Sequence, residues 1–161
     1  MPERPLERRQ TLTALLLPLA DRQLVLPNVA VAELIEYRSG TVVPGAPSWH
    51  LGNIAWRRRE LPLVCFEAAC GSAPAQGERS HIIVLNAIGG GPLAFYAMLV
   101  QGIPRSVKVD SQLSYVDVPL ARFELAAVQL AEVVAKVPDL DGLERLLQQA
   151  WQHPGEPTSR S

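Results

Sequence analysis

Short apolar runs separated by polar turns dominate the pattern of this chain. Residues 12–19 and 23–26 are apolar and are joined by Asp21-Arg22, which predicts a β-hairpin. Residues 53–56 and 61–66 predict a second hairpin, with a charged segment at or near its tip. Further strands are predicted at 81–86, 93–100, 106–109 and 128–137.

Helical patterns are fewer. Asn28 follows Pro27 and predicts a capped short helix over 29–36. Its residues Val29, Leu34 and Ile35 are expected in the core, with the alternative that one of them lines a groove. A single helical turn is predicted at 48–51, where Gly52 would stop it. The final helix, 143–151, is capped by Asp139 or Asp141 and has an apolar face formed by Leu143, Leu146, Leu147 and Ala150. Many short strands and one terminal helix indicate a mostly-β barrel architecture.

Length and composition predict one globular domain. The chain has 161 residues, of which 48% are hydrophobic and 19% charged. We expect a flexible N-terminal tail over 1–11, a single domain over 12–151 and a disordered C-terminal tail over 152–161.

Charge and hydropathy exclude several classes of partner. The formal net charge is −1 and no long cluster of Lys and Arg is present, so a nucleic-acid partner is not expected. No apolar run approaches the roughly 18 residues that cross a bilayer, and the start of the chain lacks the apolar region of a signal peptide. We therefore expect a cytoplasmic protein without direct membrane insertion.

The residues give no signature of a cofactor, a metal or catalysis. Cys65 and Cys70 lack two further ligands at zinc spacing. Gly89-Gly90-Gly91-Pro92 lacks the Lys and Ser/Thr of a phosphate-binding loop. Two alternatives stay open: a small enzyme that uses Cys65 with His81, and a β-barrel that binds a small ligand inside.

The segment 43–66 resembles the CheW-like domain family. It reads VPGAPSWHLGNIAWRRRELPLVCF, and the family pattern, vPgaPewvlGvinlRGxilPVvdL, aligns with it without a gap. The residues that fall on the pattern are Pro44, Pro47, Gly52, Ile54, Arg57, Pro62 and Val64. Weaker matches follow the family order at 26–35, 82–85, 93–103 and 137–143, so the resemblance covers about residues 12–147.

The departures from the pattern lie at the hairpin tip and at Cys65. Ala55-Trp56-Arg57-Arg58 stands where the family commonly has Asn-Leu-Arg-Gly, and Cys65 stands where it often has Asp. Arg58 replaces the residue that most easily adopts a positive φ. These departures resemble a divergent branch, the ChpC-like proteins of the chemotaxis-like system that controls type IV pili and twitching motility.

The resemblance implies a fold and a function. The fold is mainly β: two SH3-like five-stranded barrel subdomains packed together, with short helices and a C-terminal helix. The function is that of a non-catalytic adaptor that couples a methyl-accepting chemoreceptor to a CheA-like histidine kinase, near membrane receptor arrays. A cleft between the barrels would take the receptor, and a face of one barrel would pair with the kinase.

Six residues are candidates for partner binding, and each has a structural alternative. The tip arginines would face an acidic patch or simply be solvated, and Trp56 would anchor a partner or fill the core. Glu33 would hold a basic group of a partner or make a structural hydrogen bond. The predicted partner-binding set is Glu33, Ile35, Trp56, Arg57, Arg58 and Arg59.

Overall fold

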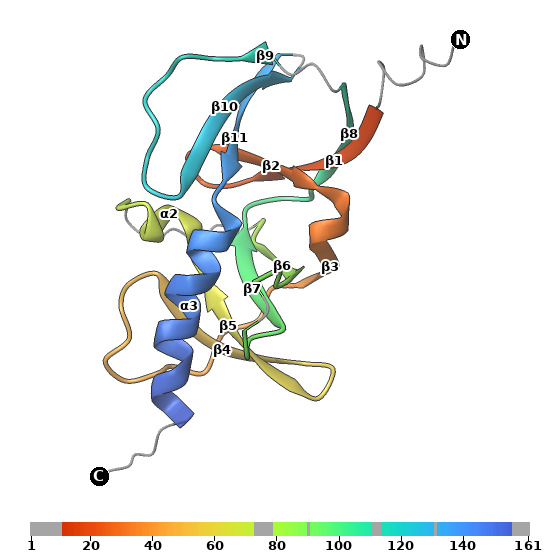
Figure 1. The fold of residues 1–161 in the computed structure, drawn as a ribbon. Helices are drawn as coiled ribbons and strands as arrows, with labels where there is room; N and C mark the ends of the chain where they lie inside the picture. Colours follow the sequence, from red (N-terminus) through yellow and green to blue (C-terminus); the bar gives the residue numbers. More distant parts are fainter. Residues whose placement is uncertain (1–10, 73–78, 90, 111–113, 131, 156–161) are drawn as a thin grey trace.

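The computed structural model describes residues 11–72, 79–89, 91–110, 114–130 and 132–155. Two curled, mostly antiparallel sheets pack against each other, and each forms one barrel subdomain (Figure 1). Most of both predicted tails, residues 1–10 and 156–161, lies outside the described residues.

The first subdomain is built from both ends of the chain. Its six strands follow the order β8-β1-β2-β11-β10-β9. They are β1 (Thr11–Pro18), β2 (Gln23–Pro27), β8 (Arg105–Asp110), β9 (Ser114–Tyr115), β10 (Glu124–Leu130) and β11 (Val133–Pro138). The predicted hairpin of β1 and β2 is confirmed, with Leu16 opposite Val25. The short β9 makes six strands where five were expected, because it adds two residues of pairing to β10.

The second subdomain is a continuous piece of the chain. Its strand order is β3-β6-β7-β5-β4, and β5 and β7 run parallel. The strands are β3 (Val31–Glu36), β4 (His50–Trp56), β5 (Arg59–Val64), β6 (His81–Asn86) and β7 (Phe95–Val100). The predicted hairpin of β4 and β5 is confirmed, and so are the predicted strands that became β6 and β7.

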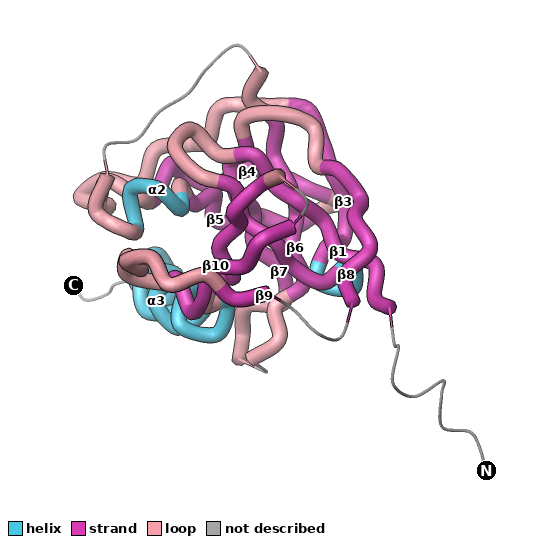
Figure 2. Tube along the Cα trace, turned by 90° about the horizontal axis from the view of Figure 1, so that it is seen from above, coloured by secondary structure: helices cyan, strands magenta, loops and turns pink. Residues whose placement is uncertain are grey.

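The helices are short except at the end of the chain. They are η1 (Asn28–Ala30), α2 (Phe66–Ala69) and α3 (Leu140–Gly155). Figure 2 shows α2 and α3 on the same side of the molecule. Asp139 caps α3 as predicted, because its Oδ1 accepts the Gly142 N–H at 3.0 Å. The backbone stays helical to Gly155, beyond the predicted end at residue 151.

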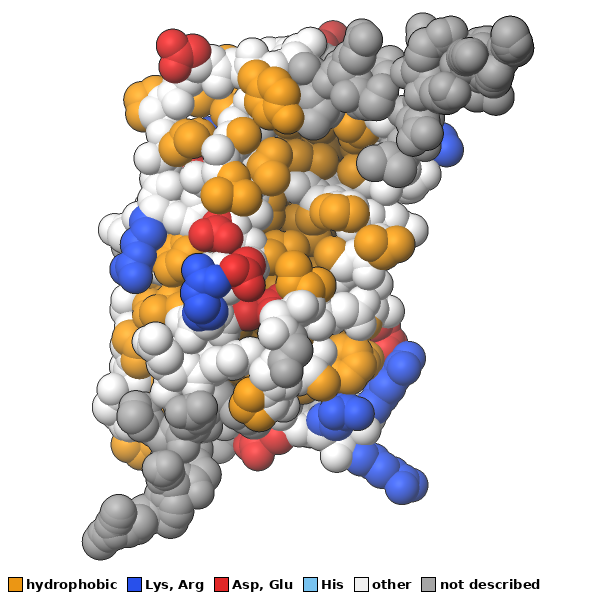
Figure 3. Space-filling view, viewed as in Figure 1, with side chains coloured by type: hydrophobic (Ala, Val, Ile, Leu, Met, Phe, Trp, Pro, Cys, Tyr) orange, Lys and Arg blue, Asp and Glu red, His pale blue; other side chains and the backbone are white. Residues whose placement is uncertain are grey.

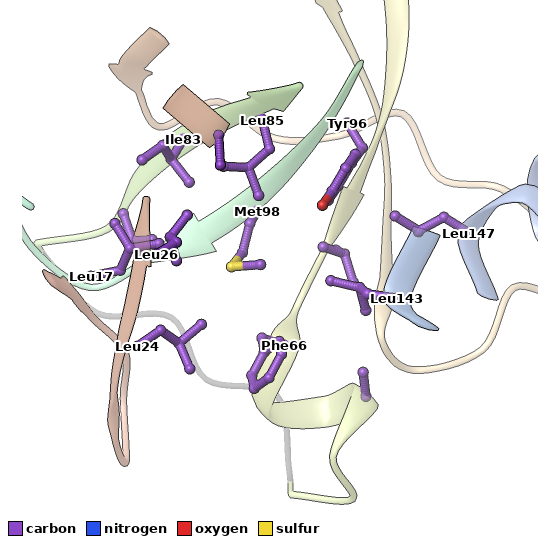
Figure 4. Close-up of a cluster of buried hydrophobic side chains, with 14 of the residues drawn as sticks. Leu17, Leu24, Leu26, Phe66, Ile83, Leu85, Tyr96, Met98, Leu143 and Leu147 are labelled. Carbon is purple, nitrogen blue, oxygen red and sulfur yellow. The ribbon is translucent and has the colours of Figure 1, made fainter. Parts of the chain in front are cut away.

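The two subdomains and α3 share one apolar core (Figure 4). Leu17, Leu24 and Leu26 come from the first subdomain, and none of them is more than 2% exposed. Side chains of α2, of the second subdomain and of α3 meet them, among them Phe66, Ile83, Leu85, Tyr96, Met98, Leu143 and Leu147. Each subdomain also has a smaller cluster within its own curled sheet. The subdomains are therefore halves of one folded unit.

The predicted helix over 29–36 is wrong. Only Asn28–Ala30 forms a 3-10 turn, and Val31–Glu36 is β3, which pairs with β6. Burial alternates along β3, so Leu34 is 37% exposed while Ile35 is half-buried. Val29, which the predicted helix placed in the core, is 82% exposed. The helical turn predicted at 48–51 is a hydrogen-bonded turn over 47–50, in which the His50 N–H donates to the Pro47 carbonyl oxygen at 3.0 Å. Gly52 does not stop it, because β4 begins at His50 and runs through Gly52.

Candidate partner-binding surface

The β4–β5 hairpin ends in a two-residue turn made of Arg57 and Arg58. Their φ angles are 50° and 65°, and Trp56 pairs with Arg59 across the turn. Two consecutive left-handed residues match the twist of a hairpin, but Asn and Gly adopt this conformation far more readily than Arg. The turn holds Arg57, Arg58 and Arg59 together at the end of the second subdomain, and we call these three residues the arginine tip.

Glu33 contacts the base of the arginine tip from another strand. It lies on β3, whereas Trp56 ends β4, and these strands are at opposite edges of the sheet. The curl of the sheet brings the two edges together. The Trp56 Nε1–H donates to Glu33 Oε1 at 2.9 Å, and Arg57 Nη2 lies 3.1 Å from the same oxygen. One carboxylate oxygen therefore ties the hairpin tip to β3.

Aromatic rings support two of the three arginines. The Arg57 guanidinium lies 4.8 Å from the centroid of the Trp56 ring, and Arg59 lies 4.9 Å from that of Phe95. The two rings contact each other at a centroid distance of 5.0 Å. Such cation–π contacts contribute roughly 0.5–1 kcal/mol each at exposed sites. They hold these guanidinium groups in place at the surface.

The structure brings most of the predicted partner-binding residues together. Trp56 is 6% exposed, so it takes the structural role and positions Glu33 and Arg57 rather than offering its own ring to a partner. Ile35 packs beside Trp56 in the cluster of the second subdomain. Arg58 is exposed at the turn. Phe95, which supports Arg59, was not among the predicted residues, because nothing in its local sequence sets it apart from other strand residues.

Positive charge is concentrated at this end of the molecule. Figure 3 shows a group of Lys and Arg side chains where the β4–β5 hairpin projects in Figure 1. Arg57 has a side chain that is 67% exposed although it is paired with Glu33. The surface therefore offers fixed guanidinium groups to a partner.

The cysteines do not form a nucleophilic site. Cys65 is fully buried, so no substrate reaches its thiol. Burial raises the pKa of Cys70 to about 11, which keeps this thiol protonated at neutral pH. Its Sγ lies 2.8 Å from the Arg122 carbonyl oxygen, to which it donates. His81, the proposed base, has its Nδ1 2.9 Å from the Arg79 carbonyl oxygen.

The described residues contain no group of three or more His, Cys, Asp and Glu side chains that would hold a metal ion. An apolar cavity of about 180 Å³ lies within the first subdomain, lined by residues such as Ala14, Val25 and Val128. It is smaller than the roughly 300–1,000 Å³ of typical small-molecule sites. Two further open pockets, one lined in part by Leu16 and Val107 and one in part by Arg22, have about 310 Å³ each. Among the described residues, no helix is long and apolar enough to cross a membrane.

Comparisons with known proteins identify the family. The model of the CheW-like domain matches residues 13–147. Among solved structures, the fold resembles that of the scaffolding protein TtCheW from Thermoanaerobacter tengcongensis, with a TM-score of 0.72 and 17% sequence identity. The similarity covers 83% of this chain and 92% of that one. A search of curated proteins found no match.

Proposed function

The chain belongs to the CheW-like domain family, and on this premise we propose that it is a non-catalytic adaptor that couples a methyl-accepting chemoreceptor to a CheA-like histidine kinase. The observation that carries the proposal is the arginine tip, a surface of fixed charges held by Glu33, Trp56 and Phe95. Such a surface can bind a protein, but none of its residues is positioned for catalysis. The adaptor would act in the cytoplasm, beside membrane receptor arrays.

We further propose that the pathway controls type IV pili and twitching motility. The departures from the family pattern at Trp56, Arg58 and Cys65 support a divergent, ChpC-like member. Two of these three residues lie at the hairpin tip, where a change in side chains alters the choice of partner. Loss of twitching in a strain that lacks this protein, with normal swimming, is the expected phenotype.

Two surfaces are proposed for the two partners. The arginine tip and Glu33 would contact the kinase. Val29, in the turn before β3, and Leu34, on β3, are 82% and 37% exposed, and these apolar side chains would contribute to the receptor contact. Apolar side chains at the centre of an interface with charges at the rim are typical of protein–protein contacts.

A pull-down of the full chain from its native host tests the proposed function. We expect recovery of a CheA-like kinase, a methyl-accepting receptor, or both. Arg57→Glu should reduce recovery of the kinase, whereas Arg105→Glu, an exposed residue of the first subdomain, should not. Recovery of neither partner by the unaltered protein would contradict the proposal.

The alternative hypothesis, a small enzyme that uses Cys65 with His81, leads to a different expectation. A catalytic cysteine reacts rapidly with alkylating agents because it is a thiolate at neutral pH. The burial of Cys65 and the raised pKa of Cys70 predict slow alkylation of both in the folded protein. Fast, stoichiometric alkylation of Cys65 at pH 7 would revive that alternative.

A further inference from the structure

A β-bulge interrupts β4 close to its start. Between the His50–Val64 pair and the Asn53–Pro62 pair, two residues of β4 lie opposite a single residue of β5. A bulge of this kind leaves an extra residue without its partner in the ladder. Gly52 is one of the two bulged residues, is buried, and donates its N–H to Nδ1 of His50 at 3.1 Å. The His50 side chain therefore supplies the acceptor that a buried N–H requires.

The bulge also holds the segment that precedes β4. Thr41 and Asn53 exchange two backbone hydrogen bonds, of 2.7 and 3.0 Å. The two backbones approach so closely that a Cβ at Gly40 would lie 2.6 Å from the Leu51 carbonyl oxygen, and one at Gly52 would lie 2.7 Å from that of Thr41. From the bulge, β4 runs directly to the arginine tip. A change in the bulge is therefore transmitted to the preceding segment and to the base of the hairpin.

The imidazole of His50 is enclosed. His50 is 8% exposed, and the Trp49 ring stacks on its imidazole at a centroid distance of 5.7 Å. Trp49 in turn packs against the shared core. Burial lowers the pKa of His50 below its ordinary value of 6.5, and a hydrogen bond to its own backbone opposes this to a smaller extent. The family pattern has an apolar residue at the aligned position, so the imidazole is a feature of this chain.

The charged groups on the elements around His50 and Trp49 are engaged elsewhere. Arg38 donates to the Ala55 carbonyl oxygen at 2.8 Å, and Glu67 accepts the Ala20 N–H at 2.7 Å. The titratable or charged side chains on these elements are Tyr37, Arg38, Arg59, Glu60, Cys65, Glu67, Asp141, Glu144 and Arg145. Within the described part of the chain, none of them shifts the pKa of His50, so burial decides the direction.

We propose that His50 is a pH-sensitive switch, in which the neutral imidazole closes the bulge of β4 and the protonated imidazole opens it. A neutral imidazole whose Nδ1 accepts the Gly52 N–H carries its own proton on Nε2. Protonation turns Nδ1 into a donor that faces another donor, and it places a charge in a buried position. Both effects favour the open form of the bulge as the pH falls.

The pH window follows from the direction of the pKa shift. The imidazole of the open chain takes up a proton near pH 6.5, whereas the imidazole of the closed bulge does so only at lower pH. The closed form is therefore fully favoured above about pH 6.5 and loses ground below it, by up to about tenfold for each pH unit. The loss levels off once the pH falls below the pKa of the closed form.

Amide hydrogen exchange in the full chain tests the switch. The quantity to measure is the protection factor of the Gly52 N–H, which is the intrinsic exchange rate at a given pH divided by the observed one. We expect it to fall at least about threefold between pH 7.5 and pH 5, and the amides of Thr41 and Asn53 to follow. The imidazole resonances of His50, recorded in the same samples, should titrate below pH 6.5.

Substitutions at His50 separate the switch from a merely structural contact. His50→Asn supplies a carbonyl oxygen that accepts the Gly52 N–H at any pH, so protection at pH 7.5 should stay within about twofold and its pH dependence should disappear. His50→Val supplies no acceptor, so Gly52 should be weakly protected at both pH values. His81→Asn is the control, because it removes an imidazole whose Nδ1 lies 2.9 Å from the Arg79 carbonyl oxygen, and the pH dependence at Gly52 should persist.

Three results would overturn the inference. One is a Gly52 protection factor in the unaltered chain that is the same at pH 7.5 and pH 5. Another is a His50 imidazole that titrates at or above pH 6.5, which decides the question even if His50→Asn fails to fold. The third is a pH dependence that His50→Asn retains in full, since it would assign the effect to another group.

Discussion

Glu33 is the residue on which the candidate surface depends. Its Oε1 receives the Trp56 indole N–H at 2.9 Å and lies 3.1 Å from Arg57 Nη2. Trp56 is buried, so its N–H has no ready access to water if the carboxylate is removed. Glu36 lies on the same strand but is exposed. The two glutamates therefore form a matched pair for mutagenesis.

We expect Glu33→Ala to lower the free energy of unfolding by about 1–3 kcal/mol, because a buried donor loses its acceptor. Glu36→Ala should change it by less than about 0.5 kcal/mol. Urea unfolding followed by tryptophan fluorescence measures both. Equal effects of the two substitutions would show that the contact at Glu33 does not fix the hairpin tip.

Glu124 is a buried carboxylate between two cations. Its Oε2 lies 2.6 Å from Arg22 Nη1 and its Oε1 lies 2.8 Å from Lys136 Nζ, while its side chain is 1% exposed. Burial by itself raises the pKa of Glu124, but the hydrogen bonds from Lys136 and from the Ala121 N–H, with the two nearby positive charges, lower it below the usual value. The carboxylate thereby joins β10, β11 and the β1–β2 turn.

A lowered pKa in the folded state makes stability depend on pH. The contribution of Glu124 is complete above the unfolded-state pKa of about 4.3, and it is lost as the pH falls through the lower folded-state pKa. Glu124→Gln should remove this acid-dependent step, and Glu124→Ala should cost about 1–3 kcal/mol, because half-buried Lys136 loses its ion pair and Arg22 keeps only its pair with Asp21. Urea titrations from pH 7 to pH 3 measure the effect. Glu132→Ala, at an exposed position, is the control, and an unchanged pH profile in Glu124→Gln would contradict the argument.

The sequence predicted which residues belong to the candidate partner-binding surface, but not which of them contact one another. Glu33 and Arg57 were candidates because they match the family pattern, and Trp56 was a candidate because it departs from that pattern. The bond between Glu33 and Trp56 joins residues 23 positions apart on the two edges of a sheet, and no local pattern encodes that distance. The burial of Trp56 follows from the same closure of the sheet.

At the level of secondary structure, Glu144 of α3 accepts hydrogen bonds from the connection between β6 and β7. This side chain, 1% exposed, accepts the Ile88 N–H at 2.9 and 3.0 Å and the Gly89 N–H at 2.8 Å. Leu143 and Leu147 on either side of it enter the shared core. The helix is thus held both by apolar packing and by backbone donors of a distant loop.

Glu144→Ala should lower the free energy of unfolding by about 1–3 kcal/mol, because two backbone donors lose their acceptor. Hydrogen exchange at Ile88 and Gly89 should become faster in the same variant. Gln149→Ala, at an exposed position of the same helix, should leave both measurements unchanged. If Ile88 and Gly89 remained as protected as before, Glu144 would not be what orders this connection.

The secondary structure was predicted correctly where it depends on the local sequence, and wrongly where it depends on pairing with a distant part of the chain. Hairpins such as β1–β2 follow from two apolar runs and a polar turn. The segment from Val29 to Glu36 contains Ala, Leu and Glu, which are good helix formers, and Asn28 resembles a cap. Pairing of β3 with β6 overrides those preferences, and that pairing joins residues about 50 positions apart.

For the whole molecule, the main property is that both subdomains share one core. Leu24 of the first subdomain is fully buried in the same cluster as Tyr96 and Met98 of the second. The chain enters the first subdomain, builds the second, and returns to complete the first. Local patterns do not show this discontinuity. The family resemblance predicted two barrels packed together, but not that the chain returns to complete the first.

A shared core predicts a single cooperative unfolding transition. Leu24→Ala should cost about 2–5 kcal/mol. The loss should appear equally in far-ultraviolet circular dichroism and in tryptophan fluorescence, to which Trp56 of the other subdomain contributes. Two separated transitions, or a fluorescence midpoint that Leu24→Ala does not move, would show that the subdomains unfold independently.

We propose that this protein acts by binding its partner through the surface around the arginine tip. The most direct test is calorimetric titration of the full chain with the regulatory domain of its own organism's CheA-like kinase. We expect a dissociation constant in the micromolar range or tighter. Arg57→Glu should weaken binding at least tenfold while the variant still unfolds cooperatively. Absence of binding, or binding that Arg57→Glu leaves unchanged, would contradict it.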